Sequence, residues 1–205
     1  MQKPLLLASS SAYRRALLSR LGLPFITASP DIDESPRAGE TADGLARRLA
    51  TEKVRALASA YPGHWVIGSD QVASLADGQR LAKPDDLDTA IDQLSRSSGQ
   101  TVTFYTGLAL LDADTAKQQV HCDVVEARFR TLSGPEIRHY LETEQPFDCA
   151  GSFKMEGLGI ALFHSLEGRD PNSLVGLPLI ELTSMLCRWG LNPLLAAQPN
   201  GLPEA

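Results

Sequence analysis

The segment from Thr41 to Tyr61 has the spacing of one amphipathic helix, and a single position breaks its pattern. Its apolar residues recur at three- and four-residue steps along one face: Ala42, Leu45, Ala46, Leu49, Ala50, Val54, Leu57 and Ala58. Lys53 falls in the middle of this apolar stripe. A lysine there must either extend its ammonium to water along the apolar surface or meet an anion. The helix therefore has to pack on a core, and Lys53 predicts either a snorkelling side chain or an ionic site on the packed face.

The first turn of the chain has the composition of an anion site. A buried strand at Leu5–Ala8 is followed by three serines, Ser9 to Ser11, and then by a helix from about Arg14 to Leu21. Backbone N–H groups and hydroxyls at a helix N-terminus suit a phosphate, and Arg14 or its neighbour could add a bidentate contact. The alternative is ordinary capping by serine with two solvated arginines.

Two carboxylates are candidate metal ligands. Asp70 ends the apolar run of a strand at Trp65–Ser69, and open α/β sheets place ligands at the C-terminal ends of central strands. Asp70 could bind a divalent metal, activate water, or both; the alternative is an aspartate in a strand-end turn. Glu34 lies in a Pro-, Asp- and Glu-rich loop at 29–40. It could be a second metal ligand or simply a solvated acid.

Two lysines are candidate phosphate partners. Lys53 could meet a phosphate instead of snorkelling. Lys83 precedes Pro84, which holds it extended, although an exposed lysine before proline is also common. Taken together, the misplaced charges predict a site for a phosphorylated ligand and its metal.

The remaining elements indicate an α/β fold. Further expected elements are a strand at 25–28, a hairpin at 71–82 around Asp77-Gly78, a helix at 85–97, strands at 101–111 and 119–131 joined near 112–116, a capped helix at 133–144, a loop at 149–168 that enters a strand through Ile160–Phe163, and a helix at 179–189. No GxGxxG or Walker loop is present. We expect one domain over 1–192 and a flexible tail over 193–205.

Composition limits the partners. The net charge of −6, from 19 basic and 25 acidic side chains, argues against broad nucleic-acid binding but allows a local cationic pocket. The three cysteines and four histidines are scattered without metal or disulfide spacing. The apolar run Pro4–Ala8 is too short for a signal peptide or a membrane span. We expect a soluble cytoplasmic protein with no membrane or nucleic-acid partner. The oligomeric state is not fixed by the sequence, and a homodimer is compatible with it.

The motifs, taken in order, resemble the Maf family of nucleoside triphosphate pyrophosphatases. The matching segments are Leu7-Ala8-Ser9-Ser10-Ser11-Ala12-Tyr13-Arg14-Arg15, Asp33-Glu34, Ala50-Thr51-Glu52-Lys53, Gly68-Ser69-Asp70-Gln71, Lys83-Pro84 and Val175-Gly176-Leu177-Pro178. They span almost the whole chain. The family usually carries proline where Ala12 stands, and this difference removes no functional group.

The resemblance implies both a fold and a reaction. The fold is the elongated mixed α/β sheet of Maf and inosine-triphosphatase-like proteins, with two lobes around a deep cleft. The reaction is attack of water at the α–β linkage of a nucleoside triphosphate, with a divalent cation (Mg²⁺ or Mn²⁺), giving a monophosphate and pyrophosphate. Asp70 matches the catalytic proton acceptor of the family. The residues that match the phosphate and metal end of its cleft are Ser9, Arg14, Glu34, Lys53 and Lys83.

Other segments resemble the branch of the family that acts on 7-methyl-GTP. They are Gly68-Ser69-Asp70-Gln71, Thr103-Phe104-Tyr105-Thr106-Gly107, Ser152-Phe153-Lys154-Met155-Glu156-Gly157 and Glu167-Gly168-Arg169-Asp170-Pro171-Asn172. The matching specificity positions are Tyr13, Gln71 and Glu156. Two alternatives are the same reaction on dTTP or UTP, and a nucleotide-binding regulator of septum formation with little turnover.

The chemistry of these side chains supports the hypothesis that the substrate is 7-methyl-GTP. Guanine presents two adjacent donors, N1–H and the exocyclic NH₂, and a carboxylate such as that of Glu156 can accept from both. The alternative for Glu156 is a surface acid in a loop. Methylation at N7 makes the base cationic, so stacking on Tyr13 would gain a cation–π contribution of about 1–2 kcal/mol when desolvated.

Overall fold

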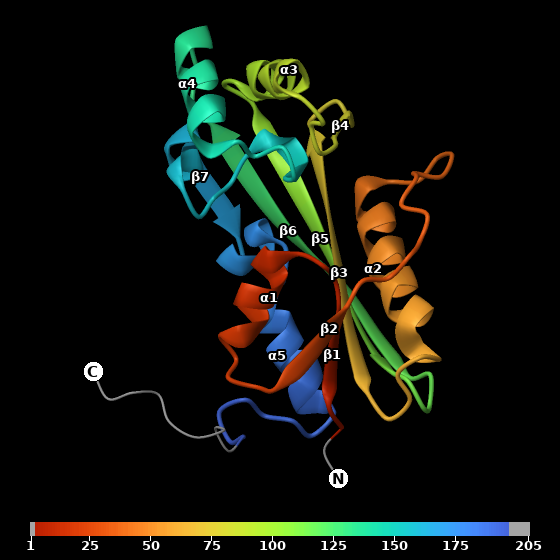
Figure 1. Ribbon diagram of the computed structural model, residues 1–205. Helices are drawn as coiled ribbons and strands as arrows, with labels where there is room; N and C mark the ends of the chain where they lie inside the picture. Colours follow the sequence, from red (N-terminus) through yellow and green to blue (C-terminus); the bar gives the residue numbers. More distant parts are fainter. Residues whose placement is uncertain (1–2, 197–205) are drawn as a thin grey trace, which may run out of the picture.

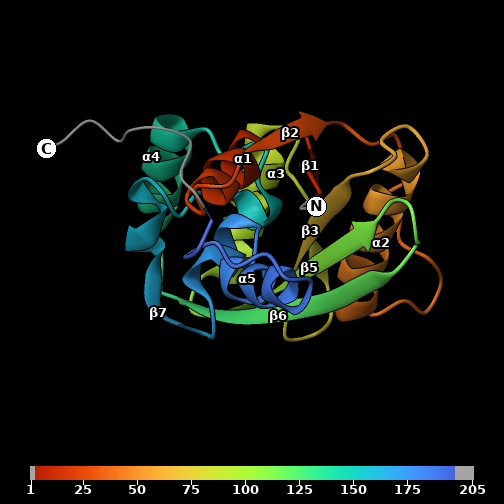
Figure 2. The same ribbon diagram turned by 90° about the horizontal axis from the view of Figure 1, so that it is seen from below.

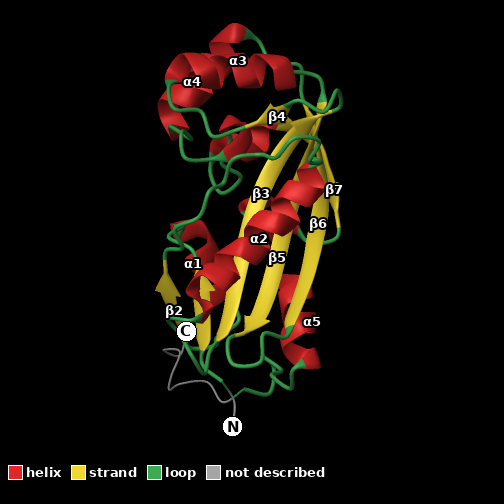
Figure 3. Ribbon diagram, turned by 90° about the vertical axis from the view of Figure 1, so that its right-hand side faces the viewer, coloured by secondary structure: helices red, strands yellow, loops and turns green. Residues whose placement is uncertain are grey.

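A single seven-stranded mixed sheet forms the centre of the molecule. The computed structural model describes residues 3–196, and Figures 1 and 3 show an elongated molecule whose long strands run from one end to the other. The strands are β1 (Leu5–Ala8), β2 (Phe25–Ala28), β3 (Trp65–Leu75), β4 (Arg80–Leu81), β5 (Thr101–Asp112), β6 (Gln118–Phe129) and β7 (Phe163–Gly168). Their order is β2-β1-β3-β5-β6-β7, with β4 also paired to β3. Strand β1 is parallel to β2 and β3, and the other pairs are antiparallel.

Helices cover both faces of this sheet. The α-helices are α1 (Ala12–Ser19), α2 (Ala42–Ala58), α3 (Leu87–Ser97), α4 (Gly134–Glu144) and α5 (Leu179–Arg188), and the 3₁₀ turns are η1 (Ala150–Ser152), η2 (Leu158–Leu162) and η3 (Pro171–Val175). Figure 2 shows α2 on one side of the sheet and α1 and α5 on the other. Helices α3 and α4 lie together at one end of the molecule (Figure 1).

The alternation of side chains along the strands decides which helix each residue meets. Val66 and Ala109 face α2 and pack with its apolar stripe, whereas Ile67 and Leu108, one position away on the same strands, pack in the cluster that contains α1 and α5. Because both faces are buried there, β3 along Trp65–Gly68 and β5 along Leu108–Leu111 are continuously apolar rather than alternating.

Two glycines bring α2 close to the sheet. A Cβ on Gly68 would lie 2.5 Å from the carbonyl oxygen of Ala50, and a Cβ on Gly107 would lie 2.1 Å from that of Ala46. Only residues without a side chain permit this approach of helix backbone to strand. The contact sets the height of Lys53, one helical turn beyond Ala50, above β3.

The far end of the sheet carries a second lobe. Strands β3, β5, β6 and β7 continue into a core with α3 and α4 that includes Phe104, Phe153 and Phe163, whose rings meet edge to face. Helix α4 begins with the capping box between Ser133 and Glu136 that the sequence predicts. The sheet therefore links two lobes, as the family resemblance implies.

Three boundaries differ from those expected from the sequence. Strand β3 does not end near Asp70 but continues to Leu75, because its polar residues remain paired with β5 between the lobes. The segment leading into β7 forms the turn η2 as far as Leu162 rather than strand. Helix α1 begins at Ala12 instead of Arg14, because Ser11 is its N-cap and accepts from the backbone N–H of Arg14.

Most other elements lie within a few residues of their expected places. The β5–β6 pair and the β3–β4 hairpin are confirmed. Among residues 3–196, no helix has both the length and the apolar character needed to cross a membrane. The expected tail lies outside the described residues from 197 onward.

Candidate active site

A cavity of about 420 Å³ lies between the two lobes, a volume in the range of small-molecule sites. Its walls come from the start of α1, from α2, from the middle of β3, and from segments 80–83 and 148–156 of the other lobe. Strand β1 pairs with β3 only along Trp65–Ile67. From Gly68 to Val72, before β4 pairs with β3 at Ala73, this edge of β3 therefore has no strand partner among the described residues, and the cavity lies along it, past the carboxyl end of β1.

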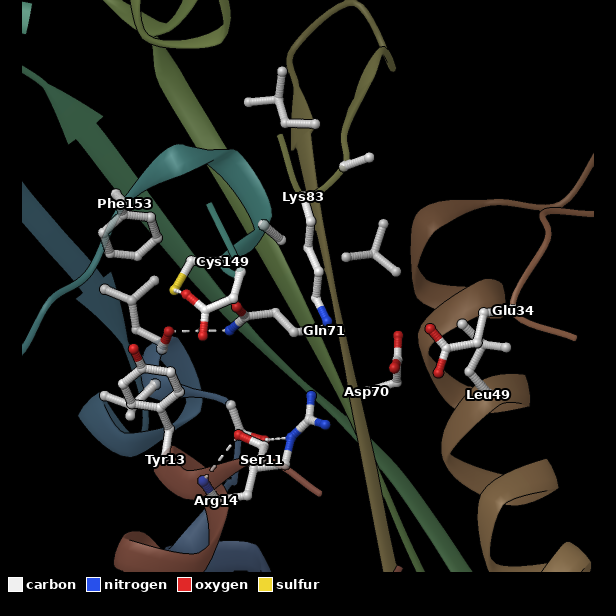
Figure 4. A pocket seen from close by; sticks show the side chains of 18 of the residues that line it. Ser11, Tyr13, Arg14, Glu34, Leu49, Asp70, Gln71, Lys83, Cys149 and Phe153 are labelled. Atoms are coloured by element: carbon white, nitrogen blue, oxygen red, sulfur yellow. Dashed lines mark hydrogen bonds between the residues drawn. The ribbon is translucent and has the colours of Figure 1, made fainter. Parts of the chain in front are cut away.

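Lys53 does not extend to solvent but joins two carboxylates. Its Nζ lies 2.5 Å from Asp70 Oδ1 and 2.7 Å from Glu34 Oε1. Lys53 is 6% exposed and Asp70 is 8% exposed, which excludes the snorkelling alternative for this lysine. Figure 4 shows Asp70 and Glu34 on the side of the cavity next to α2. Lys53 thus links helix α2, strand β3 and the acidic loop.

Arg14 and Lys83 add positive charge to the same end of the cavity. Arg14 Nε donates to the carbonyl of Gly176 at 2.9 Å, which leaves its terminal nitrogens toward the cavity (Figure 4). Burial lowers the pKa of Arg14, and the charges of Asp70 and Glu34 oppose this change. Burial alone would raise the pKa of Glu34, but the hydrogen bond and charge of Lys53, with Lys83 and Arg14, bring it below its ordinary value.

Ser9 lies one layer behind the cavity. It is buried, and its hydroxyl oxygen accepts from the backbone N–H of Ser11 at 3.1 Å. Ser11 lines the cavity and Ser9 does not. In this structure Ser9 shapes the turn at the start of α1, while the half-buried Ser11 is the serine that lines the cavity.

The other end of the cavity is aromatic and acidic. Tyr13 and Glu156 line it, together with Asp148 and Cys149. Burial and the nearby carboxylates raise the pKa of the Cys149 thiol to about 12, so this thiol is not activated as a nucleophile. Lys154 Nζ lies 5.9 Å from the centroid of the Tyr13 ring. One side of that ring already faces an ammonium.

Gln71 lies between these ends but on the opposite face of β3 from Asp70, because neighbouring residues in a strand point to opposite sides. Its amide nitrogen donates to the carbonyls of Ser173 and Leu174 at 2.8 and 3.1 Å. The structure therefore brings Asp70, Lys53, Glu34, Lys83, Arg14, Tyr13, Gln71 and Glu156 to one cavity.

The carboxylates of Asp70 and Glu34 could share a divalent cation with the phosphates of a bound ligand. No group of three or more His, Cys, Asp or Glu side chains arranged to hold a metal occurs within residues 3–196. Asp70 and Glu34 nevertheless point oxygens at the same ammonium. Magnesium is commonly bound by one or two carboxylates plus substrate phosphates, so this pair fits a metal of that kind.

The sequence alone did not identify the buried polar residues that link the sheet to segment 173–176 beside the cavity. Ser69, Thr106, Asp123 and Ser173 are all buried and connect the sheet to η3. A signal exists only for Ser69 and Thr106, which are polar residues next to apolar runs of β3 and β5, since buried polar groups need partners. Asp148 was missed as well, and it carries no such signal because it is exposed.

Comparison with known sequences gives the family. A family model described as Maf-like protein matches residues 4–189, nearly the whole chain. The chain belongs to the Maf family. This agrees with the motifs at Ser9–Arg15 and Gly68–Gln71, which the fold brings to the two sides of one cavity.

Several bacterial proteins are similar to this chain over almost their full length. A 7-methyl-GTP pyrophosphatase of Pseudomonas aeruginosa is 59% identical over 187 residues, which cover 91% of this chain and 97% of the relative. Those of Pseudomonas savastanoi pv. phaseolicola and Alcanivorax borkumensis are 58% and 57% identical, covering 92% and 91% of this chain and 97% and 94% of the relatives. This Maf protein therefore spans almost all of each relative.

Proposed function

We propose that this Maf protein is a nucleoside triphosphate pyrophosphatase that hydrolyses 7-methyl-GTP to 7-methyl-GMP and pyrophosphate, and so removes modified nucleotides. The observation that carries the proposal is one cavity with two chemically different ends. Three cations, Arg14, Lys53 and Lys83, lie at one end, Tyr13 and Glu156 lie at the other, and Gln71 lies between the two ends. A nucleotide with a cationic base and an anionic triphosphate has the complementary charge distribution. The names of the relatives support the same substrate.

The cationic end suits the triphosphate. Arg14 keeps its terminal N–H groups for a ligand because Nε is already bonded to Gly176, and a guanidinium can bind phosphate oxygens through two parallel bonds. Lys83 is exposed at the cavity rim, where its ammonium can contact the β- and γ-phosphates of the triphosphate. Ser9 supports this end through the turn it forms with Ser11.

In the proposed reaction Asp70 is the catalytic residue. It accepts the proton of the water that attacks at the α–β linkage, and pyrophosphate leaves with the electron pair of the broken P–O bond. Lys53 fixes the carboxylate through its contact with Oδ1, which leaves Oδ2 free to accept a proton from water. Positioning of this kind is a large part of the catalysis of phosphate chemistry.

We propose Asp70 and Glu34 as the ligands of a divalent cation, Mg²⁺ or Mn²⁺. Such an ion would supply positive charge against the phosphate oxygens. The acid pair fits this role because both carboxylates already face one positive charge, that of Lys53.

Tyr13 and Glu156 at the other end, together with Gln71 between the two ends, would select the base. A cationic methylated guanine can stack on the Tyr13 face away from Lys154, since the ammonium occupies the other side. Glu156 is exposed to the cavity and offers acceptors to the guanine donors. Asp148 adds a second negative charge there, which also favours a cationic base.

Pyrophosphate release from a panel of nucleotides tests the proposal. The panel contains 7-methyl-GTP, GTP, dTTP and UTP with Mg²⁺ or Mn²⁺, and Asp70→Asn is the inactive control. The highest kcat/KM on 7-methyl-GTP is expected. A preference for dTTP or UTP would support the alternative branch, and binding without turnover would support a regulator of septum formation. We also propose a cytoplasmic protein with one domain over 1–192, and sedimentation would show whether it forms a homodimer.

A further inference from the structure

Three polar residues occupy one row across the centre of the sheet. Gln71 on β3 is paired with Thr106 on β5, and Thr106 is paired with Asp123 on β6. Residues paired in this way project from the same face. All three side chains contact the turn η3 through Ser173. The sheet register thus builds a polar row beneath one turn.

The direction of each hydrogen bond in this row is fixed by chemistry. The Thr106 hydroxyl donates its single proton to the carbonyl oxygen of Ser173 at 2.8 Å, so its oxygen can only accept from Gln71 Nε2, at 3.2 Å. The carbonyls of Ser173 and Leu174 can only accept as well. An amide turned the other way would place its oxygen against two carbonyl oxygens. Gln71 is therefore held with its nitrogen toward η3.

This arrangement leaves one unused group. Within residues 3–196 no side chain or backbone group donates to Gln71 Oε1, and Gln71 lines the cavity. Figure 4 shows the Gln71 amide nitrogen bonded on the side away from Asp70. The turn is itself fixed to β6, because the buried hydroxyl of Ser173 donates to the buried carboxylate of Asp123. The amide cannot rotate without breaking several of these bonds.

We infer that η3 is a specificity-positioning element: with Thr106 and Ser173 as positioning residues, it holds the Gln71 amide so that only its oxygen faces the bound base. The base group that Gln71 reads is consequently a hydrogen-bond donor. With the acceptors of Glu156, the cavity presents acceptors to a base edge that carries N–H donors, as the guanine edge does. This inference rests on the proposed nucleotide substrate.

Gln71→Glu provides the sharpest test, because it replaces the amide nitrogen with oxygen. The ionised carboxylate would place an oxygen against the two carbonyls of η3. The protonated form reproduces the native pattern, with its O–H donating to a carbonyl and its C=O facing the cavity. We expect the kcat/KM of Gln71→Glu on 7-methyl-GTP, divided by that of the wild type at the same pH, to fall at least tenfold at pH 8 and to recover as the pH falls toward 5.5.

The matched control is Gln71→Met, which has no acceptor at any pH. Its ratio to the wild type should be low and flat across the same range. A flat ratio for Gln71→Glu, or a wild-type value at pH 8, would overturn the inference. Turnover of 7-methyl-GTP by the wild type establishes the proposed function independently of the variants. The result for Gln71→Glu then bears only on the orientation of the Gln71 amide. If the wild type binds guanine nucleotides without turnover, calorimetric affinity for 7-methyl-GTP replaces kcat/KM. If it neither binds nor hydrolyses them, both ideas fail.

The positioning residues are tested by selectivity rather than by total activity. Thr106→Val and Ser173→Ala should lower the kcat/KM ratio of 7-methyl-GTP over dTTP by about three- to tenfold, and Thr106→Ser should restore it. Ser97→Ala is the control, since Ser97 is equally buried and its hydroxyl bonds the carbonyl of Gln93 in α3, away from the cavity. If Thr106→Val and Ser173→Ala lower Tm as Ser97→Ala does but keep the wild-type ratio, the role of η3 is only structural.

Discussion

Lys53 Nζ lies 2.5 Å from Asp70 Oδ1, although the two residues come from a helix and a strand that could not approach this closely over ordinary side chains. Gly68 and Gly107 permit the approach. The pair is buried, so its two charges depend on each other, and this dependence can be measured.

Asp70→Asn should lower turnover by about 10²–10⁴-fold, because the amide cannot accept a proton from water. Initial rates of pyrophosphate release and thermal unfolding are measured together. Asp92→Asn, on the exposed side of α3, is the control and should keep both values. A folded Asp70→Asn protein with near-native turnover would remove Asp70 from the catalytic role.

Lys53→Met should destabilise the protein by about 3 kcal/mol, because it leaves the buried carboxylate of Asp70 without its partner. Adding Asp70→Asn should restore part of this loss, with a coupling of at least about 1 kcal/mol in a double-mutant cycle by urea unfolding. The exposed pair Arg47–Asp43 is the control, with an expected coupling below about 0.5 kcal/mol. Additive effects at Lys53 and Asp70 would contradict a coupled buried pair.

Gly107→Ala should move α2 away from β5, since the new Cβ would overlap the carbonyl of Ala46. We expect a loss of about 1–3 kcal/mol in stability, together with reduced kcat, because Lys53 moves with the helix. Gly134→Ala is the matched control, because nothing lies within 4 Å of its added Cβ. Native stability and activity in Gly107→Ala would show that the helix does not need this close approach.

Acid sensitivity should depend on Glu40. Its hydrogen bond to Arg48 lowers the pKa of Glu40 from its ordinary value to about 2, and Arg48 also binds the carbonyl of Ser35 in the acidic loop. The pKa of Glu40 is lower in the folded than in the unfolded protein. The ionised carboxylate therefore stabilises the folded state fully above the ordinary pKa of about 4.5, and this stabilisation is lost as the pH falls toward 2. Over that range unfolding should take up about one proton less in Glu40→Gln than in the wild type. Stability curves from pH 5 to pH 2.5 measure the difference, and parallel curves would exclude this role.

Base selection should depend on Glu156. Glu156→Gln removes one acceptor and the negative charge, and an unpaired donor costs about 1–3 kcal/mol, or roughly ten- to a hundredfold in kcat/KM. The loss should be greatest for 7-methyl-GTP, smaller for GTP and least for dTTP and UTP. An equal loss on all four nucleotides would mean that Glu156 does not read the base.

The sequence by itself determined most of the elements and the family. The period of the apolar residues in α2, the serines before α1 and the capping box of α4 are local signals, so they could be read without the fold. The anomalous position of Lys53 is visible in the sequence for the same reason. The motif order was sufficient for the Maf assignment, which the family match confirms.

Only the tertiary structure decided what these residues meet. The partners of Lys53 lie 17 and 19 residues away on other elements, and no periodicity encodes such a contact. The length of β3 could not be read either, because Asp70 and Gln71 look like a strand end until β5 is seen to pair with them. The row Gln71, Thr106 and Asp123 exists only in the register of three strands. Local patterns fix helices and turns, but a site formed by separate strands depends on how they are paired.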